Sequence, residues 1–541
     1  MINAKLKVPT PINEPIFDYE PGSAPRAELQ EALKTQWDAP LEVPVIIGGK
    51  EIRTGNTYDL TSPQDNKHVI AKVHMASPEH VEQAAVAARK AWKIWSEMPY
   101  HARASVFLKA ADLLAGPWRA RLNASTIIGQ SKTCHQAEID AACELIDFLR
   151  FNAHYGEQLM GEQPSSSRGM WNYVDHRPLE GFVFAITPFN FTAIAGNLPS
   201  APALMGNVIL WKPASTQVHA GYQLMQLFKA AGLPDGVVNF LPGRGAQVGD
   251  PVLKQPGLAG VHFTGSTAVF QRMWRTIGEN IADYATYPRI VGETGGKDFI
   301  VVHDSADEDA VTTAIIRGSF EFQGQKCSAA SRVFLSESFY KRIKGRLAEQ
   351  TRAIKMGDPA DFSNFMGAVI DKAAFESIKG YIDYAKQSND GDIVVGGECD
   401  DSRGWFIRPT VVQAKTPDFK LMREEIFGPV VTLYPYADGH FDDALRLCDE
   451  GSPYALTGAI FAQDRVVVEH AAQALRHTAG NFYINDKPTG AVVGQQPFGG
   501  GRASGTNDKA GSVLNLLRWV SPRTVKETFV PATDYRYPYM K

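Results

Sequence analysis

Short runs of consecutive apolar residues alternate with longer amphipathic segments in the second third of the chain. The runs are GFVFAI (181–186), NVILWK (207–212), VVNFLP (237–242), GVHFTG (260–265) and DFIVVH (298–303). Strands of a parallel sheet are buried on both faces and have this continuous apolar character. The intervening segments, such as 215–232, have helical periodicity, so the alternation predicts a parallel α/β sheet.

The same alternation begins again beyond residue 327. The segments 331–354, 391–398 and 458–475 combine apolar runs with helical periodicity. A chain of 541 residues is also longer than one hydrophobic core usually serves. We therefore predict a second α/β domain after the first.

The N-terminal part of the chain has a different character. Residues 1–40 are rich in proline and acidic side chains, which predicts an arm lying over the body rather than a core element. VPVIIGGKEI (43–52) predicts a small hairpin that turns at two glycines. A capping serine, a proline and an apolar stripe predict an amphipathic helix over 77–98, and helical patterns follow at 102–116 and 137–156.

Composition and charge exclude several classes of protein. With 55 basic and 59 acidic side chains the formal net charge is −4, so nucleic acid is not an expected partner. No apolar run reaches the roughly 18 residues that a membrane helix needs. The N-terminus has neither a signal-peptide pattern nor an Arg-rich, acid-poor presequence. We expect the cytoplasm, with the mitochondrial matrix as the alternative if a presequence is missing.

The cysteines and histidines give no sign of a disulfide framework or a metal site. The 5 cysteines are scattered without a C-x-x-C pair, and none of the 13 histidines forms a His-x-x-x-His pair. We therefore expect no bound metal.

One cysteine has unusual neighbours. FQGQKCSAA (322–330) places Cys327 directly after Lys326 and among small and polar residues. An inert interior thiol is the more common case. A nucleophilic cysteine needs a nearby cation, a helix N-terminus or backbone donors, and Lys326 and the small Ser328 permit such help. Taken alone, the segment leaves both interpretations open.

Two further polar residues follow predicted strands. Asn190 in TPFNF is either a turn residue that bonds its own backbone or a donor directed at an oxyanion. Glu293 in VGETGGKD precedes a Gly-Gly pair that allows close backbone approach. In a cramped apolar site its pKa would be raised and it could act as a base, whereas a salt-bridged structural role is the alternative.

Residues that could bind a nucleotide lie beyond other predicted strands. Lys212 ends an apolar strand just before a proline, where it could contact a ribose or phosphate, or simply cover apolar surface with its stem. Ser266 in FTGST could begin a phosphate-binding helix or an ordinary capped one. The turn GRGAQVG (243–249) is one residue longer than the dinucleotide fingerprint and is weak evidence alone.

Taken together, these motifs resemble those of the aldehyde dehydrogenase superfamily. TPFNF, LWKPAS, FTGST, ETGGK, GQKCSA and EEIFGPV follow the family's order and approximate spacing, and the resemblance covers essentially the whole chain. NDKPTGAVVGQQPFGGGRASGTNDKAG and the helix over 137–156 look most like the branch that oxidises L-glutamate γ-semialdehyde, the Δ1-pyrroline-5-carboxylate dehydrogenases of proline catabolism, in their stand-alone form.

The resemblance implies a fold and a division into domains. The implied fold is α/β, with two doubly wound domains, one for the cofactor and one for catalysis, and a small β oligomerisation flap. The implied divisions are an N-terminal arm (1–40), an NAD-binding domain (41–169 and 182–297), a catalytic domain (298–505) and an oligomerisation segment (170–181 and 506–541). The tail (523–541) contains β-forming residues without an obvious local partner, so it pairs with another segment or another subunit, or it is tucked on its own domain. The tail and the segment 169–181 look like an inter-subunit sheet, and a homodimer is the minimal expectation.

The resemblance also implies site residues. Cys327 is the implied nucleophile, Glu293 the general base, and Asn190 with the Cys327 backbone N–H the oxyanion hole. The implied NAD-binding residues are Thr187, Phe189, Lys212, Ser215, Gly245, Gly265, Ser266, Val269, Glu425 and Phe427. The implied substrate-binding residues are Glu144 for the ammonium, Ser328 and the backbone at Gly490 and Ala491 for the carboxylate, and Phe191 and Phe498 along the carbon chain.

Two positions depart from the pattern of the family. Phe270 stands where the superfamily has the last glycine of its phosphate-binding turn, and Ala491 stands where this branch usually has serine. The first puts the details of pyrophosphate contact in doubt, and the second removes a hydroxyl contact while keeping a backbone N–H. The residues leave open NAD+ against NADP+, another short ω-semialdehyde as substrate, and a non-catalytic structural protein on the same fold.

Overall fold

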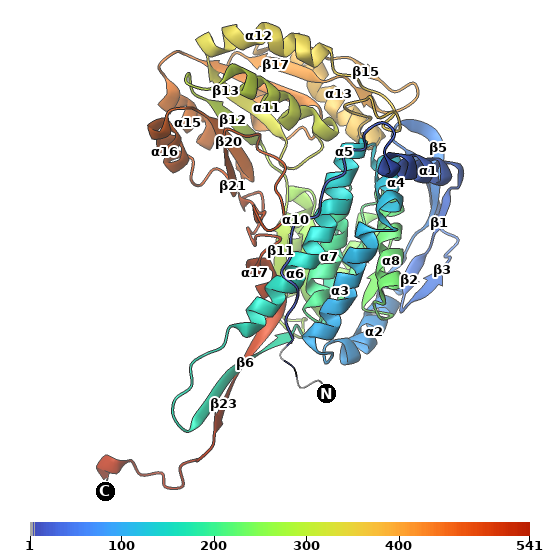
Figure 1. The fold of residues 1–541 in the computed structure, drawn as a ribbon, viewed down its shortest axis with the longest axis vertical. Coiled ribbons are helices and arrows are strands. Elements are labelled where there is room, and N and C mark those ends of the chain that lie inside the picture. The colour runs from blue at the N-terminus through green and yellow to red at the C-terminus, as the bar shows by residue number, and fades with distance from the viewer. Residues whose placement is uncertain (1–3, 5, 541) are drawn as a thin grey trace.

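The computed structural model describes residue 4 and residues 6–540. Figure 1 shows two lobes, each built on a seven-stranded sheet, and a long two-stranded ribbon that leaves the body. None of the helices among the described residues is long and apolar enough to cross a membrane.

The first sheet has the order β11-β10-β7-β8-β9-β2-β3. Its first five strands are parallel, and the apolar runs predicted four of them, β7 to β10; the run DFIVVH instead forms a strand of the second sheet. β2 and β3 form the predicted antiparallel hairpin and join the sheet beside β9. The strands are β2 (Val45–Ile47), β3 (Lys50–Ile52), β7 (Phe182–Ile186), β8 (Val208–Lys212), β9 (Val238–Phe240), β10 (Leu258–Thr264) and β11 (Arg289–Glu293).

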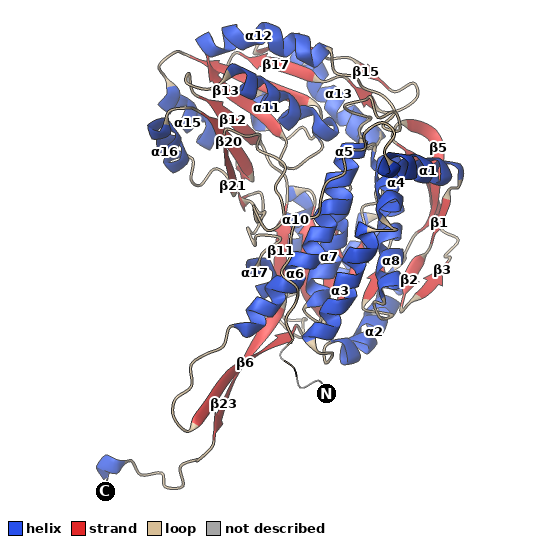
Figure 2. Cartoon of the chain, viewed as in Figure 1, coloured by secondary structure: helices blue, strands red, loops and turns tan. Residues whose placement is uncertain are grey.

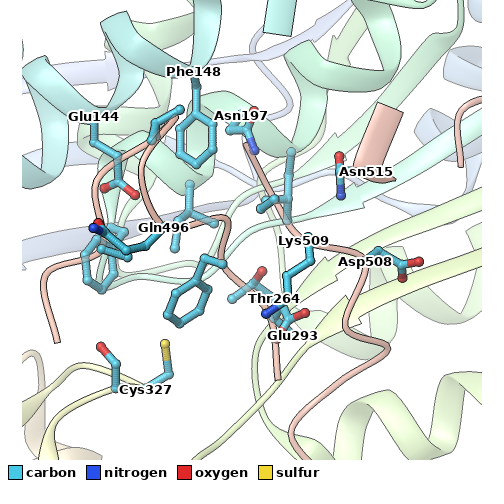
Figure 3. A pocket seen from close by; sticks show the side chains of 18 of the residues that line it. Glu144, Phe148, Asn197, Thr264, Glu293, Cys327, Gln496, Asp508, Lys509 and Asn515 are labelled. Carbon is cyan, nitrogen blue, oxygen red and sulfur yellow. The ribbon is translucent and has the colours of Figure 1, made fainter. Parts of the chain in front are cut away.

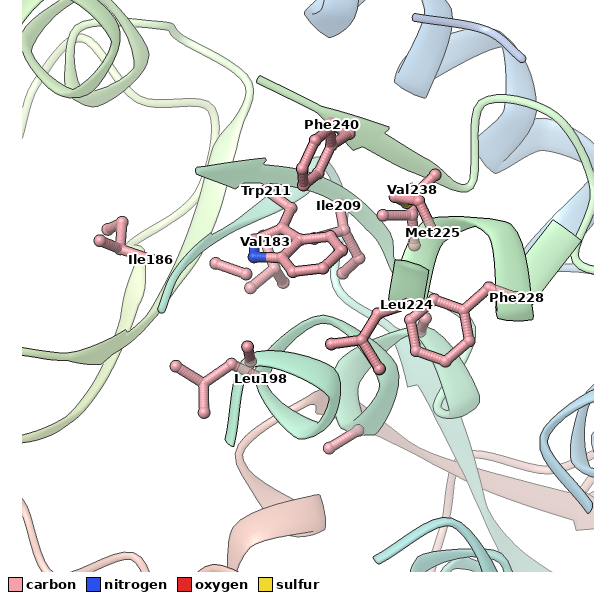
Figure 4. Packing of buried hydrophobic residues seen from close by; sticks show 14 of the residues in the cluster. Val183, Ile186, Leu198, Ile209, Trp211, Leu224, Met225, Phe228, Val238 and Phe240 are labelled. Atoms are coloured by element: carbon pink, nitrogen blue, oxygen red, sulfur yellow. The ribbon is translucent and has the colours of Figure 1, made fainter. Parts of the chain in front are cut away.

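Buried aromatic and aliphatic side chains join this sheet to its helices. Trp211 of β8 is fully buried and lies against Phe240 of β9 with ring centroids 4.9 Å apart. Figure 4 shows Trp211 and Phe228 packed between the strands and the neighbouring helices. The helices of this lobe are α2 (Pro78–Trp95), α3 (Tyr100–Ala115), α4 (Arg119–Gln130), α6 (Glu144–Gly161), α7 (Thr192–Leu204), α8 (Val218–Ala231), α9 (Gly245–Leu253) and α10 (Thr267–Glu279).

The predicted helix over 137–156 contains an irregular turn. α5 (Cys134–Ala137) continues into a π-helical turn, η1 (Glu138–Cys143), and then into α6. A π-helical turn rotates the side chains that follow it relative to a regular helix, and such turns are common at functional sites. Glu144, the first residue of α6, lines the main cavity.

The second sheet has the order β14-β17-β18-β13-β12-β20-β21, and only β14 runs antiparallel to its neighbour. This confirms a second α/β unit. Its strands are β12 (Asp298–Val302), β13 (Ala330–Ser336), β14 (Gly391–Val395), β17 (Thr410–Ala414), β18 (Val430–Tyr436), β20 (Thr457–Phe461) and β21 (Asn481–Ile484). Its helices include α11 (Glu308–Phe320), α12 (Glu337–Arg352), α13 (Lys372–Gln387), α15 (Phe441–Glu450) and α16 (Arg465–Ala474).

The N-terminal segment is only partly the arm that its composition predicted. α1 (Ala24–Asp38) is a regular helix, and its Leu29 and Leu33 are buried in the core of the first lobe. The two leucines are four residues apart and share one face of the helix. The prediction that residues 1–40 contribute no core element was therefore wrong for this helix. A small sheet of β1 (Leu41–Val43), β5 (Asp65–His74) and β4 (Thr57–Ser62) follows it.

The tail pairs with another segment of the same chain. β23 (Val520–Thr528) runs antiparallel to β6 (Met170–Pro178), and Figure 2 shows the two strands extending together away from the body. This confirms the pairing of the tail with another segment. The short helix α17 (Val513–Leu517) joins the ribbon to the body.

Candidate active site

One cavity brings together residues from both lobes (Figure 3). The predicted nucleophile, the predicted base and all six predicted substrate residues line it: Cys327, Glu293, Glu144, Phe191, Ser328, Gly490, Ala491 and Phe498. They come from the start of α6, the segments after β7 and before β13, the end of β11 and the loop that follows β21. Asn190 is the one predicted catalytic residue outside the lining.

A rigid turn presents Cys327 to the cavity. Phe322, Gln323 and Gly324 all have positive φ angles, between 50° and 66°, a conformation that costs energy for residues with side chains. A Cβ on Gly324 would lie 2.2 Å from the carbonyl oxygen of Gly428, so only glycine fits there. Gln323 fixes the turn because its buried amide donates to the carbonyls of Ser131 (3.1 Å) and Ala368 (2.7 Å).

Cys327 lines two cavities. Besides the main cavity, Cys327 lines a smaller one together with Glu425 and Phe427. Burial raises the pKa of the thiol well above its usual range, and the charges of Asp298 and Glu425 raise it further. A raised pKa favours the protonated thiol, and attack on a substrate requires that this proton leave.

The side chain of Asn190 is hydrogen-bonded to the segment that contains the nucleophile. Its buried side-chain Nδ2 donates to the carbonyl of Gln325, at 3.0 Å, two residues before Cys327. A carboxamide has two N–H groups, and this hydrogen bond uses one of them. The second is the group that could donate to an oxyanion.

Glu293 ends β11 and is held by the loop over 499–509. Its Oε2 accepts a hydrogen bond from the backbone N–H of Gly500 at 2.8 Å. Burial raises the pKa of Glu293 well above its ordinary value, while the Gly500 N–H and the charge of Lys509 oppose that shift. The Lys509 ammonium donates to the carbonyls of Gly480 (2.8 Å) and Gly499 (3.1 Å), so its charge is fixed in place. The sequence had given no indication of Lys509.

The substrate side of the cavity contains a carboxyl group without a hydrogen-bond partner among the described residues. Glu144 makes no hydrogen bond or ion pair with any of the described residues, and burial raises its pKa well above the usual range. Nearby, Lys132 donates to Asp140 at 2.7 Å and lies over the ring of Phe191 at 4.3 Å. Burial lowers the pKa of Lys132 to about 8. Sequence reasoning missed Lys132 and Asp140, because neither lies in a recognisable motif.

The carboxylate-binding residues predicted from the resemblance also line the cavity. The hydroxyl groups of Ser328 and Thr489 are 2.8 Å apart. The backbone N–H groups of Gly490 and Ala491 have no acceptor among residues 4 and 6–540. Two adjacent free N–H groups on a cavity wall are suitable donors for an anion.

The residues predicted to bind the cofactor lie mainly at the carboxyl edge of the first sheet. Lys212 ends β8, and its buried ammonium donates to the Pro213 carbonyl at 2.9 Å. Burial lowers its pKa to about 8. Ser215 donates to the Gly243 carbonyl at 3.3 Å. Ser266 is the N-cap residue of α10, on which Val269 is half-buried, and Gly245 begins α9.

Other members of this set already have partners within the protein. The Thr187 hydroxyl accepts from the indole N–H of Trp211 at 3.0 Å, and the Gly265 N–H donates to the carbonyl of Glu293 at 3.2 Å. The rings of Phe189 and Phe427 meet edge to face with centroids 5.8 Å apart. Glu425 accepts a hydrogen bond from the Gly296 N–H at 2.9 Å. These bonds fix the walls of the predicted cofactor site.

Phe270 has a packing role at the position where the family pattern has glycine. Its ring stacks on Phe263 with centroids 5.3 Å apart. It also covers Gly292 of β11, where an added Cβ would lie 2.3 Å from the ring. The large residue on α10 therefore faces a glycine on the neighbouring strand.

Comparison with known proteins agrees with this site. The family model described as "Aldehyde dehydrogenase family" matches residues 51–525. The mitochondrial Δ1-pyrroline-5-carboxylate dehydrogenase of Dictyostelium discoideum is 52% identical over 540 residues, which cover 99% of this chain and 97% of the relative. A crystal structure of the Mycobacterium tuberculosis Δ1-pyrroline-5-carboxylate dehydrogenase bound with NAD has a TM-score of 0.97 and 51% identity, with 100% of both chains covered.

A more distant structure has the same fold. The Thermus 1-pyrroline-5-carboxylate dehydrogenase with bound NAD is 33% identical, with a TM-score of 0.91 over 97% of this chain and 100% of that one. The matches span the two lobes and the cavity between them. This chain therefore belongs to the aldehyde dehydrogenase family.

Proposed function

We propose that this protein oxidises L-glutamate γ-semialdehyde, which is in equilibrium with Δ1-pyrroline-5-carboxylate, to L-glutamate with NAD+. The observation that carries the proposal is the convergence of Cys327, Glu293, Glu144 and the free N–H groups at Gly490 and Ala491 on one cavity. The two relatives near 50% identity, aligned over almost the whole chain, have this activity in their names, and the solved one binds NAD.

The residues at the carboxyl edge of the first sheet fit a dinucleotide. The buried ammonium of Lys212 has one hydrogen-bond partner among residues 4 and 6–540, the Pro213 carbonyl, so two of its N–H groups are available for a ribose. Ser266 occupies the N-cap position of α10 without bonding its N–H groups, and the N-terminal N–H groups of this 13-residue helix suit the pyrophosphate. Glu425 and Phe427 share the smaller cavity with Cys327, where the nicotinamide riboside would be held. When bound, NAD+ supplies the hydride acceptor.

The chain's own residues account for the first chemical step. Cys327 loses its thiol proton to solvent, and the resulting thiolate attacks the aldehyde carbon and forms a hemithioacetal alkoxide. We assign the free N–H of Asn190 and the backbone N–H of Cys327 to stabilise that oxygen, since fixed donors are worth most where charge develops in a site closed to water. Hydride leaves the same carbon, and a thioester on Cys327 remains.

Glu293 is assigned to the second step. It removes a proton from a water molecule, the resulting hydroxide attacks the thioester carbon, and Cys327 leaves as thiolate. The raised pKa of Glu293 suits this role, because a base whose pKa lies closer to neutrality has more driving force to take a proton.

We assign substrate selection to residues that bind the ammonium and the carboxylate of the substrate. Glu144 would bind the ammonium, and the N–H groups of Gly490 and Ala491, with the Ser328 hydroxyl, would bind the carboxylate. The absence of a serine hydroxyl at 491 leaves the backbone contact in place. Phe191 and Phe498 would flank the carbon chain between them.

The test is a substrate panel with NAD+ and NADP+. We expect kcat/KM for glutamate semialdehyde to exceed that for an uncharged aldehyde of similar length, such as pentanal, by two orders of magnitude or more, since each charged contact contributes about 1.5–3 kcal/mol. Preference for pentanal, or for another short ω-semialdehyde, would contradict the substrate assignment. Absence of turnover with every aldehyde would support a structural protein instead.

We further propose that the protein is at least a homodimer joined through the β6–β23 ribbon. A two-stranded ribbon is only marginally stable by itself, and this one exposes Trp171 and the adjoining Phe529. In this proposal the ribbon belongs to the oligomerisation segment (170–181 and 506–541), beside an NAD-binding domain (41–169 and 182–297) and a catalytic domain (298–505). Light scattering after size exclusion tests it: deletion of residues 520–541 is expected to give monomers, and an unchanged mass would contradict the assignment.

The compartment is also a proposal. The Dictyostelium discoideum relative has "mitochondrial" in its name. We propose the cytoplasm for this chain, with the mitochondrial matrix as the competing outcome, and cell fractionation followed by immunodetection decides between them.

A further inference from the structure

The N-terminal arm, residues 8–19, is tied to helix carboxylates of the first lobe. The backbone N–H of Val8 lies 3.0 Å from both carboxylate oxygens of Glu157. Farther along, the N–H of Glu14 donates to Asp147 at 2.8 Å, and the hydroxyl of Tyr19 donates to Glu138 at 2.6 Å. These carboxylates belong to η1 and α6, the helical segments that also position Glu144.

Asn13 of the arm reaches two walls of the substrate cavity at once. Its Nδ2 donates to Asp147 Oδ2 of α6 at 2.7 Å and to the backbone carbonyl of Val493 at 2.8 Å. Its Oδ1 accepts from the side chain of Gln495 at 2.9 Å. Both N–H groups and the oxygen of this half-buried amide therefore have partners, which fixes its orientation.

The two walls are those assigned to the substrate's opposite charges. On α6, Asp147 lies one turn after Glu144. On the other side, Val493 belongs to the loop over 489–498, which contains the free N–H groups of Gly490 and Ala491. Asn13 itself is not among the residues that line the cavity.

Among the described residues, no backbone hydrogen bond joins the loop over 489–498 to α6. Within it, the N–H groups of Gln495 and Gln496 both donate to the carbonyl of Val492, at 3.0 Å and 2.9 Å. The neighbouring carbonyl of Val493 accepts from Asn13. The loop nevertheless packs directly on α6 at Gly494, where an added Cβ would lie 2.1 Å from the ring of Phe151. Loss of Asn13 should therefore change the loop's position rather than unfold it.

From this bridge we infer that Asn13 is a positioning residue for substrate selection: it sets the separation between the ammonium-binding and carboxylate-binding walls. The inference rests on the proposed function. In an α-amino acid the ammonium and the carboxylate are attached to one carbon, so both contacts form only when the two walls are held at one spacing. An aldehyde without these groups does not depend on that spacing. The N-terminal arm is thereby part of the specificity of the active site, although it contributes nothing to the chemistry.

The test compares three variants by their kinetics with glutamate semialdehyde and with pentanal. Asn13→Ala removes all three hydrogen bonds. Tyr19→Phe is the matched control, because it removes a buried hydrogen bond between the same arm and a helix carboxylate without touching the loop. Asn13→Asp combined with Asp147→Asn keeps a hydrogen bond between positions 13 and 147 and an acceptor for Gln495, but it replaces the donor to the Val493 carbonyl by a carboxylate oxygen that repels it.

We expect Asn13→Ala to raise the KM of glutamate semialdehyde about tenfold and to reduce kcat less than twofold. The rise in KM is the size expected from the loss of a hydrogen bond to a carboxylate, here that of Asp147. Kinetics with pentanal should be unchanged, and Tyr19→Phe should match the wild type with both aldehydes. The double variant should keep the raised KM. An unchanged KM in Asn13→Ala, equal losses with both aldehydes, or a normal KM in the double variant would each overturn the inference.

These outcomes are separate from failure of the proposed function. If the wild type does not prefer glutamate semialdehyde over pentanal, the substrate assignment itself is wrong. If the wild type has that preference and Asn13→Ala retains it, only the role of Asn13 is wrong.

Discussion

Replacement of Asn190 by alanine tests the proposed oxyanion hole. The variant loses the amide N–H that would donate to the alkoxide on the substrate and also the 3.0 Å hydrogen bond to the Gln325 carbonyl. Loss of one oxyanion donor raises the barrier by about 2.7–4 kcal/mol, which slows the step by about 100- to 1,000-fold. The lost bond to Gln325 lowers the free energy of unfolding by about 0.5–1.5 kcal/mol.

The assay separates these two effects. Stopped-flow NADH formation at saturating substrate measures the first-order burst, which includes attack by Cys327 and hydride transfer, whereas urea unfolding measures stability. We expect a burst slower by two to three orders of magnitude in a protein that is still folded without denaturant. A burst rate within threefold of the wild type would refute the assignment of Asn190, and so would a normal burst followed by slow steady-state turnover.

Three further predictions follow from other contacts. Lys509→Met removes a cation that lowers the pKa of Glu293. Since the base acts when deprotonated, the acid limb of the pH–kcat profile should move to higher pH in this variant, while Lys509→Arg should leave the limb in place. An unmoved limb in the methionine variant contradicts this role. Gly292→Ala places a methyl group against the Phe270 ring and should cost about 1–3 kcal/mol in urea unfolding, with an unchanged midpoint as the contrary result. Lys212→Met should raise the KM of NAD+ about tenfold and leave that of the aldehyde unchanged, and an unaltered KM for NAD+ would exclude a ribose contact.

The parts of this molecule that the sequence predicted are those specified by local pattern. Parallel strands buried on both faces are continuous apolar runs, so β7, β8, β10 and β12 could be placed before the structure was known. Cys327 was identifiable because its neighbours are small and polar. The family motifs then predicted that Cys327 and Glu293 would share a site, and they line the same cavity.

Other features depend on contacts that leave no trace in spacing or composition. Asn13 and Val493 are separated by 480 positions, and no local pattern connects an arm residue to a loop that far away. Phe270 could be seen to replace a glycine, but only the fold places Gly292 opposite its ring. The helix containing Leu29 and Leu33 was missed for a different reason: its apolar pair was present in the sequence, and the prolines that precede it concealed the pattern.

The central claim of this account is that Cys327 forms a thioester that Glu293 then hydrolyses through water. Intact-mass and peptide mass spectrometry of Glu293→Gln, mixed with Δ1-pyrroline-5-carboxylate and NAD+, tests it most directly. The account predicts one equivalent of NADH released in a burst and one glutamyl group retained on the peptide that contains Cys327. Undiminished steady-state turnover without an adduct, or an adduct on a different cysteine, would contradict it.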